Sequence, residues 1–150
     1  MPLLILIYIS DMFVHFVKGD LLKNRGCLAH TVSSDLKMSR GIAYQFKSKF
    51  GRIDILRKQR RHVGDTPYIT DRGRKIFYLI TKSKYWEKPE LYHIEEALEN
   101  LKKELIKKNI KSVSMPKIAT GLDRQDWMQV YSIIIRVFNQ TDITLNIYKL

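Results

Sequence analysis

The feature that most constrains the fold of this chain is a run of five consecutive apolar residues, IFYLI at positions 76–80. A strand with one face in water alternates apolar and polar residues, so an unbroken run indicates a strand that is buried on both faces. The run lies in the second arm of a predicted hairpin, because residues 68–70 and 75–81 flank Asp71-Arg72-Gly73, a turn whose glycine can adopt a positive φ. Such a strand requires a sheet that is covered on both sides.

Strand-like and helix-like patterns alternate along the rest of the chain. Short β-prone apolar runs predict four further strands, at residues 13–17, 27–32, 113–118 and 143–148. Apolar residues at three- and four-residue spacing predict helices, at residues 41–50, 53–63, 90–108 and 127–138. This alternation favours an α/β fold with a mixed, largely parallel sheet and helices on both of its faces.

The size and composition of the chain fit one compact domain. Its 150 residues are 45% hydrophobic, and seven glycines and four prolines are too few for a long flexible region. The single cysteine, Cys27, lies in an apolar run and is interpreted as a small buried side chain, which fits a reducing compartment. We expect a monomer with one domain at residues 13–150 and an apolar extension or extra strand at residues 1–12.

The N-terminal apolar segment at residues 3–9 is too short to cross a bilayer. It also lacks the basic residues that precede the apolar core of a signal peptide, and Asp11 closes it quickly. The sequence therefore predicts a soluble, intracellular protein that does not use a membrane as a partner.

A formal charge of +12 at pH 7 favours polyanionic partners, such as nucleic acid or a ligand that carries phosphates. Four basic residues, Arg57, Lys58, Arg60 and Arg61, are clustered in a predicted short helix. The cluster is a candidate contact for nucleic acid. A solvated helix face explains the same residues, and no aromatic residues are interleaved with them to stack on bases.

Charged residues follow three of the predicted strands. Asp20 comes after the first strand, Lys82 follows the central strand, and Asp123 lies in the glycine-containing loop after residues 113–118. If these strands are parallel neighbours, the three groups meet at one edge of the sheet, where open α/β sheets bind ligands. A lysine, a carboxylate and free backbone N–H groups suit a phosphorylated ligand with an electrophilic carbon.

Each of these residues also has a purely structural interpretation. Asp20 can cap a helix or form a turn, and the stem of Lys82 can pack while its amine reaches solvent. Asp123 can cap the helix that begins near Trp127, with Asp126 at the third helical position. His30, inside a predicted strand, is expected to be a hydrogen-bonded imidazole in the core or on the wall of a cleft, because no second ligand at metal spacing accompanies it.

A set of short motifs occurs in a characteristic order along the chain. They are Val17-Lys18-Gly19-Asp20-Leu21, Leu28-Ala29-His30, Met38-Ser39-Arg40-Gly41-Ile42-Ala43 with Gln45-Phe46-Lys47, Tyr78-Leu79-Ile80-Thr81-Lys82, Ser114-Met115-Pro116, and Gly121-Leu122-Asp123-Arg124 with Trp127. Together, from about residue 13 to residue 150, they resemble the macrodomain family. The resemblance is greatest to its small single-domain branch, the terminal ADP-ribose protein glycohydrolase.

The resemblance implies a three-layer α/β/α domain that binds ADP-ribose and needs no cofactor, either metal or redox. It implies a hydrolase that removes mono-ADP-ribose from ADP-ribosylated proteins, where the sugar is ester-linked to glutamate or aspartate, with related activity on O-acyl-ADP-ribose. It also implies a role in the DNA damage response, in the nucleus or the cytoplasm. The alternative is a non-catalytic module that binds ADP-ribose, or one that binds poly-ADP-ribose or nucleic acid through the basic cluster.

The resemblance further implies a role for each site residue. Lys82 would attack the anomeric carbon of the distal ribose to give a lysyl adduct, and Asp123 would transfer protons and help resolve that adduct. Asp20, with Leu21 beside it, would accept a hydrogen bond from the adenine amino group. The backbone of Gly121 and Leu122 would bind the diphosphate. Four residues would line the path of the distal ribose and diphosphate: Ser33, Met38, Gly41 and Ile42.

Two positions depart from the pattern of the resembling family. Relatives usually carry glycine where this chain has Ala119, and a small pair or Gly-Lys where it has Ser39-Arg40. The extra methyl group of Ala119 could crowd the diphosphate, and Arg40 could clash with a phosphate or pair with it.

Overall fold

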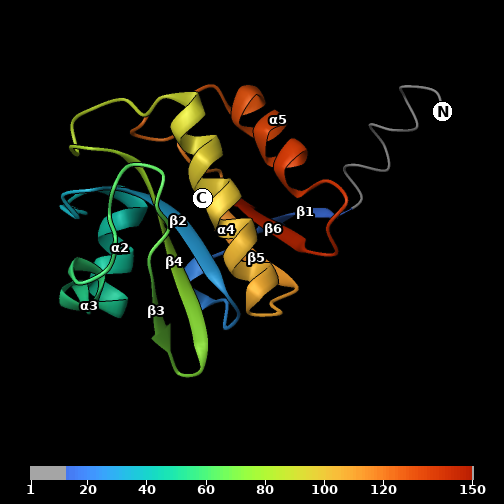
Figure 1. Ribbon diagram of the computed structural model, residues 1–150, viewed down its shortest axis with the longest axis horizontal. Coiled ribbons are helices and arrows are strands. Elements are labelled where there is room, and N and C mark those ends of the chain that lie inside the picture. Colours follow the sequence, from blue (N-terminus) through green and yellow to red (C-terminus); the bar gives the residue numbers. More distant parts are fainter. Residues whose placement is uncertain (1–12, 150) are drawn as a thin grey trace.

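The computed structural model describes residues 13–149, so the extension predicted at residues 1–12 lies outside the described part of the chain. Residues 13–149 form one six-stranded sheet in the order β1-β6-β5-β2-β4-β3 (Figure 1). Neighbouring strands are parallel, except that β3 pairs antiparallel with β4. The strands are β1 (Val14–Lys18), β2 (Leu28–Ser33), β3 (Tyr68–Asp71), β4 (Arg74–Lys82), β5 (Ser112–Pro116) and β6 (Thr144–Lys149). The predicted mixed, largely parallel sheet is confirmed.

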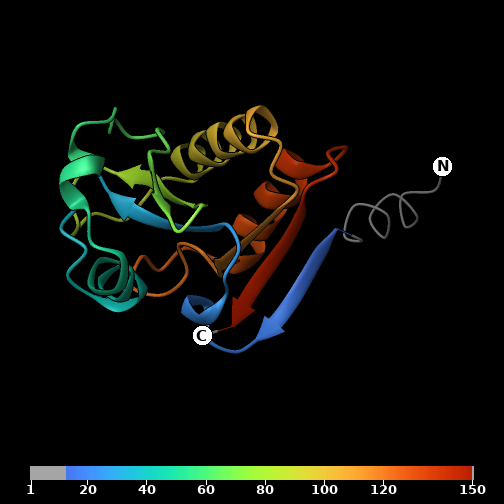
Figure 2. The same cartoon turned by 90° about the horizontal axis from the view of Figure 1, so that it is seen from below.

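Helices cover both faces of this sheet, as the two-sided burial of residues 76–80 predicted. The helices α4 (Leu91–Lys107) and α5 (Trp127–Phe138) pack on one face, and α2 (Gly41–Phe50) and α3 (Ile53–Arg57) pack on the other. In Figure 2, α4 and α5 lie above the sheet and α2 lies below it. A short 3-10 helix, η1 (Leu21–Lys23), follows β1. No helix in the described part of the chain is long and apolar enough to cross a bilayer.

The central strand β4 supplies both hydrophobic cores through the alternation of its side chains. Phe77 and Leu79 are fully buried in the core beneath α4 and α5, whereas Ile76, Tyr78 and Ile80 are fully buried in the core beneath α2 and α3. Because alternate residues of a strand point to opposite faces, an unbroken apolar run fills two cores at once.

The hairpin between β3 and β4 turns through two residues in left-handed conformations. Arg72 has φ 51° and Gly73 has φ 84°. Two successive positive φ values are typical of a type I′ turn, whose twist matches that of two paired strands. The predicted hairpin is therefore confirmed, including the positive φ of its glycine.

The helix predicted at residues 53–63 ends early, so that prediction is wrong for its second half. α3 ends at Arg57, and the side chain of Gln59 turns toward the edge strand β3. Its amide donates to the carbonyl of Tyr68 at 2.7 Å and accepts from the N–H of Tyr68 at 3.0 Å. These two hydrogen bonds satisfy backbone groups on the open side of an edge strand. The contact joins segments that are apart in the sequence, so the helical spacing of apolar residues does not reveal it.

Two polar side chains, one just before β2 and one within it, are buried. Cys27 is buried as predicted, and burial raises the pKa of its thiol to about 12. His30 is fully buried in β2, where its ring stacks on that of Phe46 at a centroid distance of 3.8 Å. It is a core imidazole, but the expected hydrogen bonds are missing, because neither ring nitrogen has a partner within residues 13–149.

The C-terminal ends of three neighbouring strands form the edge that carries most of the predicted site. β2 ends at Ser33, β4 at Lys82 and β5 at Pro116, and β2 lies between the other two. β1, which precedes Asp20, is separated from β2 by β6 and β5. The expectation that the three charged groups follow neighbouring parallel strands is therefore not met in full. Lys82 and the β5–α5 loop follow parallel strands with only β2 between them, whereas Asp20 follows a strand farther along the sheet.

Candidate functional site

A cavity of about 870 Å³ opens at the C-terminal ends of β2, β4 and β5. Three loops line it, namely those between β2 and α2, between β4 and α4, and between β5 and α5. Because these loops follow neighbouring parallel strands, they meet at the edge where open α/β sheets bind ligands. Five basic side chains and two carboxylates line the cavity, which therefore suits an anionic ligand.

The cavity brings together eight of the ten predicted site residues. Its lining includes Ser33, Met38, Gly41, Ile42, Lys82, Gly121, Leu122 and Asp123. Asp20 and Leu21 are not part of the lining. The carboxylate of Asp20 accepts from the N–H of Leu22 at 3.0 Å and so caps η1, which confirms its structural interpretation. Leu21 is fully buried in the core beneath α2 and α3.

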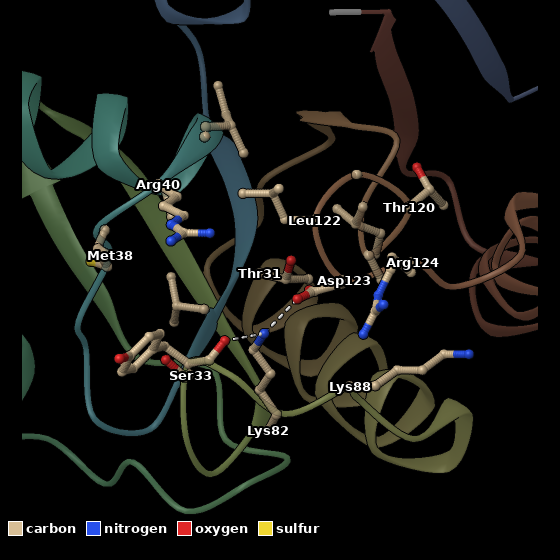
Figure 3. Close-up of a pocket in the computed structure, with 18 of the residues that line it drawn as sticks. Thr31, Ser33, Met38, Arg40, Lys82, Lys88, Thr120, Leu122, Asp123 and Arg124 are labelled. Atoms are coloured by element: carbon tan, nitrogen blue, oxygen red, sulfur yellow. Dashed lines mark hydrogen bonds and ion pairs between the residues drawn. The ribbon is translucent and has the colours of Figure 1, made fainter.

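The pair Lys82 and Asp123 joins two of the three loops across the cavity (Figure 3). Lys82 is the last residue of β4, and its Nζ lies 2.5 Å from Oδ1 of Asp123. The same amine donates to the carbonyl of Tyr85 at 2.9 Å. The side chains of Lys82 and Asp123 are only 12% and 17% exposed. The amine and the carboxylate are within direct hydrogen-bond distance of each other, which is the geometry that proton transfer between two groups requires.

This ion pair overturns the structural interpretations of both residues. Lys82 does not extend its amine into open solvent. Asp123 does not cap α5, because the helix begins at Trp127 with Asp126 at the N-cap position and has no side-chain cap. The carboxylate of Asp123 reaches toward β4, where the charged amine is a stronger partner than a neutral backbone N–H.

The β5–α5 loop contains two small residues whose backbones differ. Ala119 adopts φ 64°, a left-handed conformation that glycine tolerates and an L side chain rarely adopts. That conformation is a physical reason for the glycine usual at this position in the resembling family. The φ of Gly121 is not positive, and a Cβ built there would meet no heavy atom within 4 Å. The fold therefore does not require glycine at position 121, and the missing side chain leaves its backbone accessible to a ligand.

The β2–α2 and β5–α5 loops approach each other at Gly41 and Leu122. Gly41 has φ 60°, and a Cβ at this position would lie 3.4 Å from Cδ1 of Leu122. Leu122 itself is 65% exposed. Figure 3 shows the guanidinium of Arg40 pointing into the cavity from the wall opposite Leu122. Arg40 is thus placed to meet an anionic group of a ligand at this narrow point.

Sequence reasoning missed the contribution of the β4–α4 loop. Tyr85 and Trp86 line the cavity and are 46% and 68% exposed, and this aromatic pair is the only signal that could have indicated the loop. The amine of Lys82 donates to the backbone carbonyl of Tyr85. Every residue has such a carbonyl, so the sequence gives no sign of this contact. Within residues 13–149, no group of three or more His, Cys, Asp or Glu side chains is placed to hold a metal ion.

Known proteins match this chain over most of its length. The profile of the Macro domain family matches residues 29–134. Human ADP-ribose glycohydrolase OARD1 is 39% identical over 139 residues, which cover 91% of each chain. Among solved structures, the macrodomain of Mycobacterium tuberculosis DarG has a TM-score of 0.81 at 26% identity, over 90% of this chain and 96% of that one. Thermosipho africanus DarTG, solved in complex with ADP-ribose, has a TM-score of 0.81 at 20% identity, over 94% of this chain and 42% of that one.

Proposed function

The chain belongs to the macrodomain family, and we propose that it is an enzyme, an ADP-ribose glycohydrolase. The observation that carries this proposal is the Lys82–Asp123 pair, held at 2.5 Å on the wall of a basic cavity. The 39% identity to human ADP-ribose glycohydrolase supports the same activity. A module that only binds ADP-ribose would have no chemical use for an amine paired with a carboxylate at this point.

We propose that ADP-ribose lies along the cavity with its diphosphate against the β5–α5 loop. The open space beside Gly121 would let the phosphates approach the backbone of Gly121 and Leu122, and Arg40 would pair with them from the opposite wall. The distal ribose would then reach Lys82, along a path lined by Ser33, Met38, Gly41 and Ile42. The adenine would extend beyond the cavity toward Asp20 and Leu21.

The proposed reaction proceeds through a covalent lysyl adduct. Asp123 first accepts a proton from the Lys82 ammonium, and the neutral amine attacks the anomeric carbon of the distal ribose. The new C–N bond replaces the C–O bond to the carrier, whose carboxylate leaves with the electron pair. Water then attacks the same carbon and releases ADP-ribose together with the protonated lysine. Asp123 loses its proton to solvent, and the pair returns to its resting charge state.

We propose that the substrates are esters of mono-ADP-ribose with glutamate or aspartate side chains. A departing carboxylate is stable as an anion, so its release needs no general acid. Glycosidases that expel an alcohol use two carboxylates on either side of the bond, whereas this reaction needs one carboxylate and one amine. O-acyl-ADP-ribose has the same kind of leaving group and is a second proposed substrate.

The test is release of ADP-ribose from glutamate-ADP-ribosylated protein. Lys82→Ala should abolish both release and the adduct seen by intact mass spectrometry, and Asp123→Ala should slow turnover at least about 100-fold. Lys103→Ala is the matched control, because this exposed lysine of α4 does not line the cavity. If the wild type binds ADP-ribose tightly but releases none, the protein is a reader and the enzyme proposal fails.

A second candidate function rests on the basic cluster. The side chains of Arg57, Lys58 and Arg60 are exposed and make no hydrogen bond or ion pair within residues 13–149, whereas Arg61 donates to the carbonyl of Ser34 at 2.9 Å. Free cations of this kind favour nucleic acid or poly-ADP-ribose as an accessory partner. Such binding should fall steeply with salt, survive Lys82→Ala and disappear when the three free residues become alanine. Binding unchanged in that triple variant would contradict it.

A further inference from the structure

The amine of Lys82 is held by two acceptors, and one of them lies in an exposed loop. Oδ1 of Asp123 is 2.5 Å from the amine and the carbonyl of Tyr85 is 2.9 Å from it. The loop at residues 83–90 that carries Tyr85 contains two of the large exposed aromatic side chains of the protein, Tyr85 and Trp86. A carbonyl in such a loop can direct the amine only if the loop itself is anchored.

The anchor is Asp35, in the loop between β2 and α2. Its Oδ2 accepts from the backbone N–H of Tyr85 at 3.2 Å. Its Oδ1 accepts from the hydroxyl of Ser33 at 2.5 Å and from the N–H of Lys37 at 3.1 Å. The backbone N–H of Asp35 donates to the carbonyl of Ser83 at 3.3 Å. One half-buried carboxylate therefore joins the two loops, and the loop that it anchors carries the carbonyl that accepts from the Lys82 amine.

Two further observations concern this junction, one on the charge of Asp35 and one on the ring of Tyr85. Burial would raise the pKa of Asp35, but the hydrogen bonds from Ser33, Lys37 and Tyr85 outweigh burial and hold the pKa below its usual value. The ammonium of Lys37 also lies 5.9 Å from the centre of the Tyr85 ring, within the range of a cation–π contact. Residues of the β2–α2 loop thus hold both the backbone and the side chain of Tyr85.

We propose that Asp35 is a positioning residue that orients the Lys82 amine through the backbone of Tyr85. The inference rests on the proposed lysine chemistry and adds a residue to it. Asp35 does not line the cavity, so it is not placed to touch the substrate and acts through Tyr85. No sequence motif indicates this role, because the group that transmits it is a peptide carbonyl.

The physical reason for this role is that the lone pair of the Lys82 nitrogen must point in a particular direction to attack. After Asp123 has accepted one proton, the neutral amine of Lys82 retains two N–H groups. One of them stays on the Tyr85 carbonyl, and this bond limits the directions in which the lone pair can point. A flexible four-carbon side chain without this second acceptor would sample many orientations, and a displacement of about 1 Å at a reacting atom can slow a reaction about 100-fold.

The first arm of the experiment measures kinetics of Asp35→Asn and Asp35→Ala. Asp35 accepts three hydrogen bonds in the wild type. In Asp35→Asn one of the two oxygens becomes an NH2 group, which donates and cannot accept, so at least one of these bonds is lost. We expect kcat to fall about 10- to 100-fold, while KM and the Kd for ADP-ribose stay within about twofold. Asp65→Asn is the matched control, because Asp65 also accepts from a loop N–H, that of His62 at 2.8 Å, and lies outside the cavity lining.

The second arm observes the amine without relying on turnover. The ¹⁵Nζ ammonium signal of Lys82, assigned by its absence in Lys82→Ala, should exchange slowly with water in the wild type and rapidly in both Asp35 variants. Urea unfolding of each variant shows whether it is folded under the conditions used. If the wild type has no hydrolase activity, the proposed function fails. The ¹⁵Nζ signal of Lys82 then still tests whether Asp35 anchors the loop that holds the amine.

Two results would overturn the proposal. One is an unchanged kcat together with an unchanged Lys82 signal in folded Asp35→Asn. The other is a rise in KM and in the Kd for ADP-ribose with no loss of kcat, which would assign Asp35 to shaping the binding surface rather than orienting the amine.

Discussion

Four residues other than glycine adopt left-handed backbone conformations in two of the loops that form the cavity. They are Leu36 with φ 53°, Met38 with φ 46°, Ala119 with φ 64° and Arg124 with φ 60°. A left-handed conformation costs an L residue about 1–2 kcal/mol, and such strain is found where loops must present backbone groups to a ligand. At the residue scale, these two loops therefore depart from local backbone preference, as other turns of the molecule also do.

Gly121 provides a residue-scale test of diphosphate binding. Gly121→Ala should change the free energy of unfolding by no more than about 0.5 kcal/mol, because the position is exposed and the new methyl meets no protein atom. The same methyl should intrude on the phosphates and raise the Kd for ADP-ribose at least about tenfold, or about 1.4 kcal/mol. Urea denaturation and titration calorimetry measure the two effects.

Gly41→Ala is the informative comparison for this prediction. Gly41 has φ 60°, and a Cβ there would lie 3.4 Å from Leu122, so this variant should lose stability as well as affinity. Unchanged affinity in Gly121→Ala would place the diphosphate elsewhere in the cavity.

At the scale of secondary-structure elements, contacts between distant segments decide where some helices begin and end. α3 ends at Arg57 although its sequence pattern continues, since Gln59 bonds to the edge strand β3. α5 begins without a side-chain cap because Asp123, the expected cap, forms an ion pair with Lys82. In both cases a polar side chain that could have extended or capped a helix has a partner in another element.

The role of Gln59 can be tested by its removal. Gln59→Ala should lower the free energy of unfolding by about 1–2 kcal/mol, because both backbone groups of Tyr68 lose a hydrogen-bond partner. Urea unfolding measures the change. Lys58→Ala is the neighbouring control, since that exposed side chain makes no contact of this kind within residues 13–149. Equal stability of the two variants would show that the bond pair with β3 does not hold this segment.

At the scale of the whole molecule, a neutral imidazole in the core makes the fold sensitive to acid. Burial lowers the pKa of His30 from its usual 6.5 to about 3, and the ring has no hydrogen-bond partner in the described part of the chain. Between these two pH values the unfolded state binds a proton that the folded state does not. The contribution of His30 to stability is therefore complete above pH 6.5 and is lost as the pH falls toward 3.

This linkage predicts a pH profile. Within the window from pH 6.5 to pH 3, His30 should remove stability at up to about 1.4 kcal/mol per pH unit. His30→Leu removes the titrating ring and should unfold with a shallower pH dependence, while His62→Leu, at an exposed position, serves as the control. Urea unfolding across the window measures both slopes. Parallel profiles for wild type and His30→Leu would exclude His30 as the source of acid sensitivity.

The sequence by itself determined the layers of this protein and the residue types available to its site. The apolar run 76–80 predicted a central strand correctly because burial on two faces requires apolar side chains at every position, a local property. Only the tertiary structure decided which strand ends meet, since strand order depends on pairing between segments far apart in the chain. It brought Lys82 and Asp123 together, set Asp20 apart after a strand that β6 and β5 separate from β2, and placed the carbonyl of Tyr85 against the amine. A peptide carbonyl has the same chemistry in every residue, so only the fold could select this one.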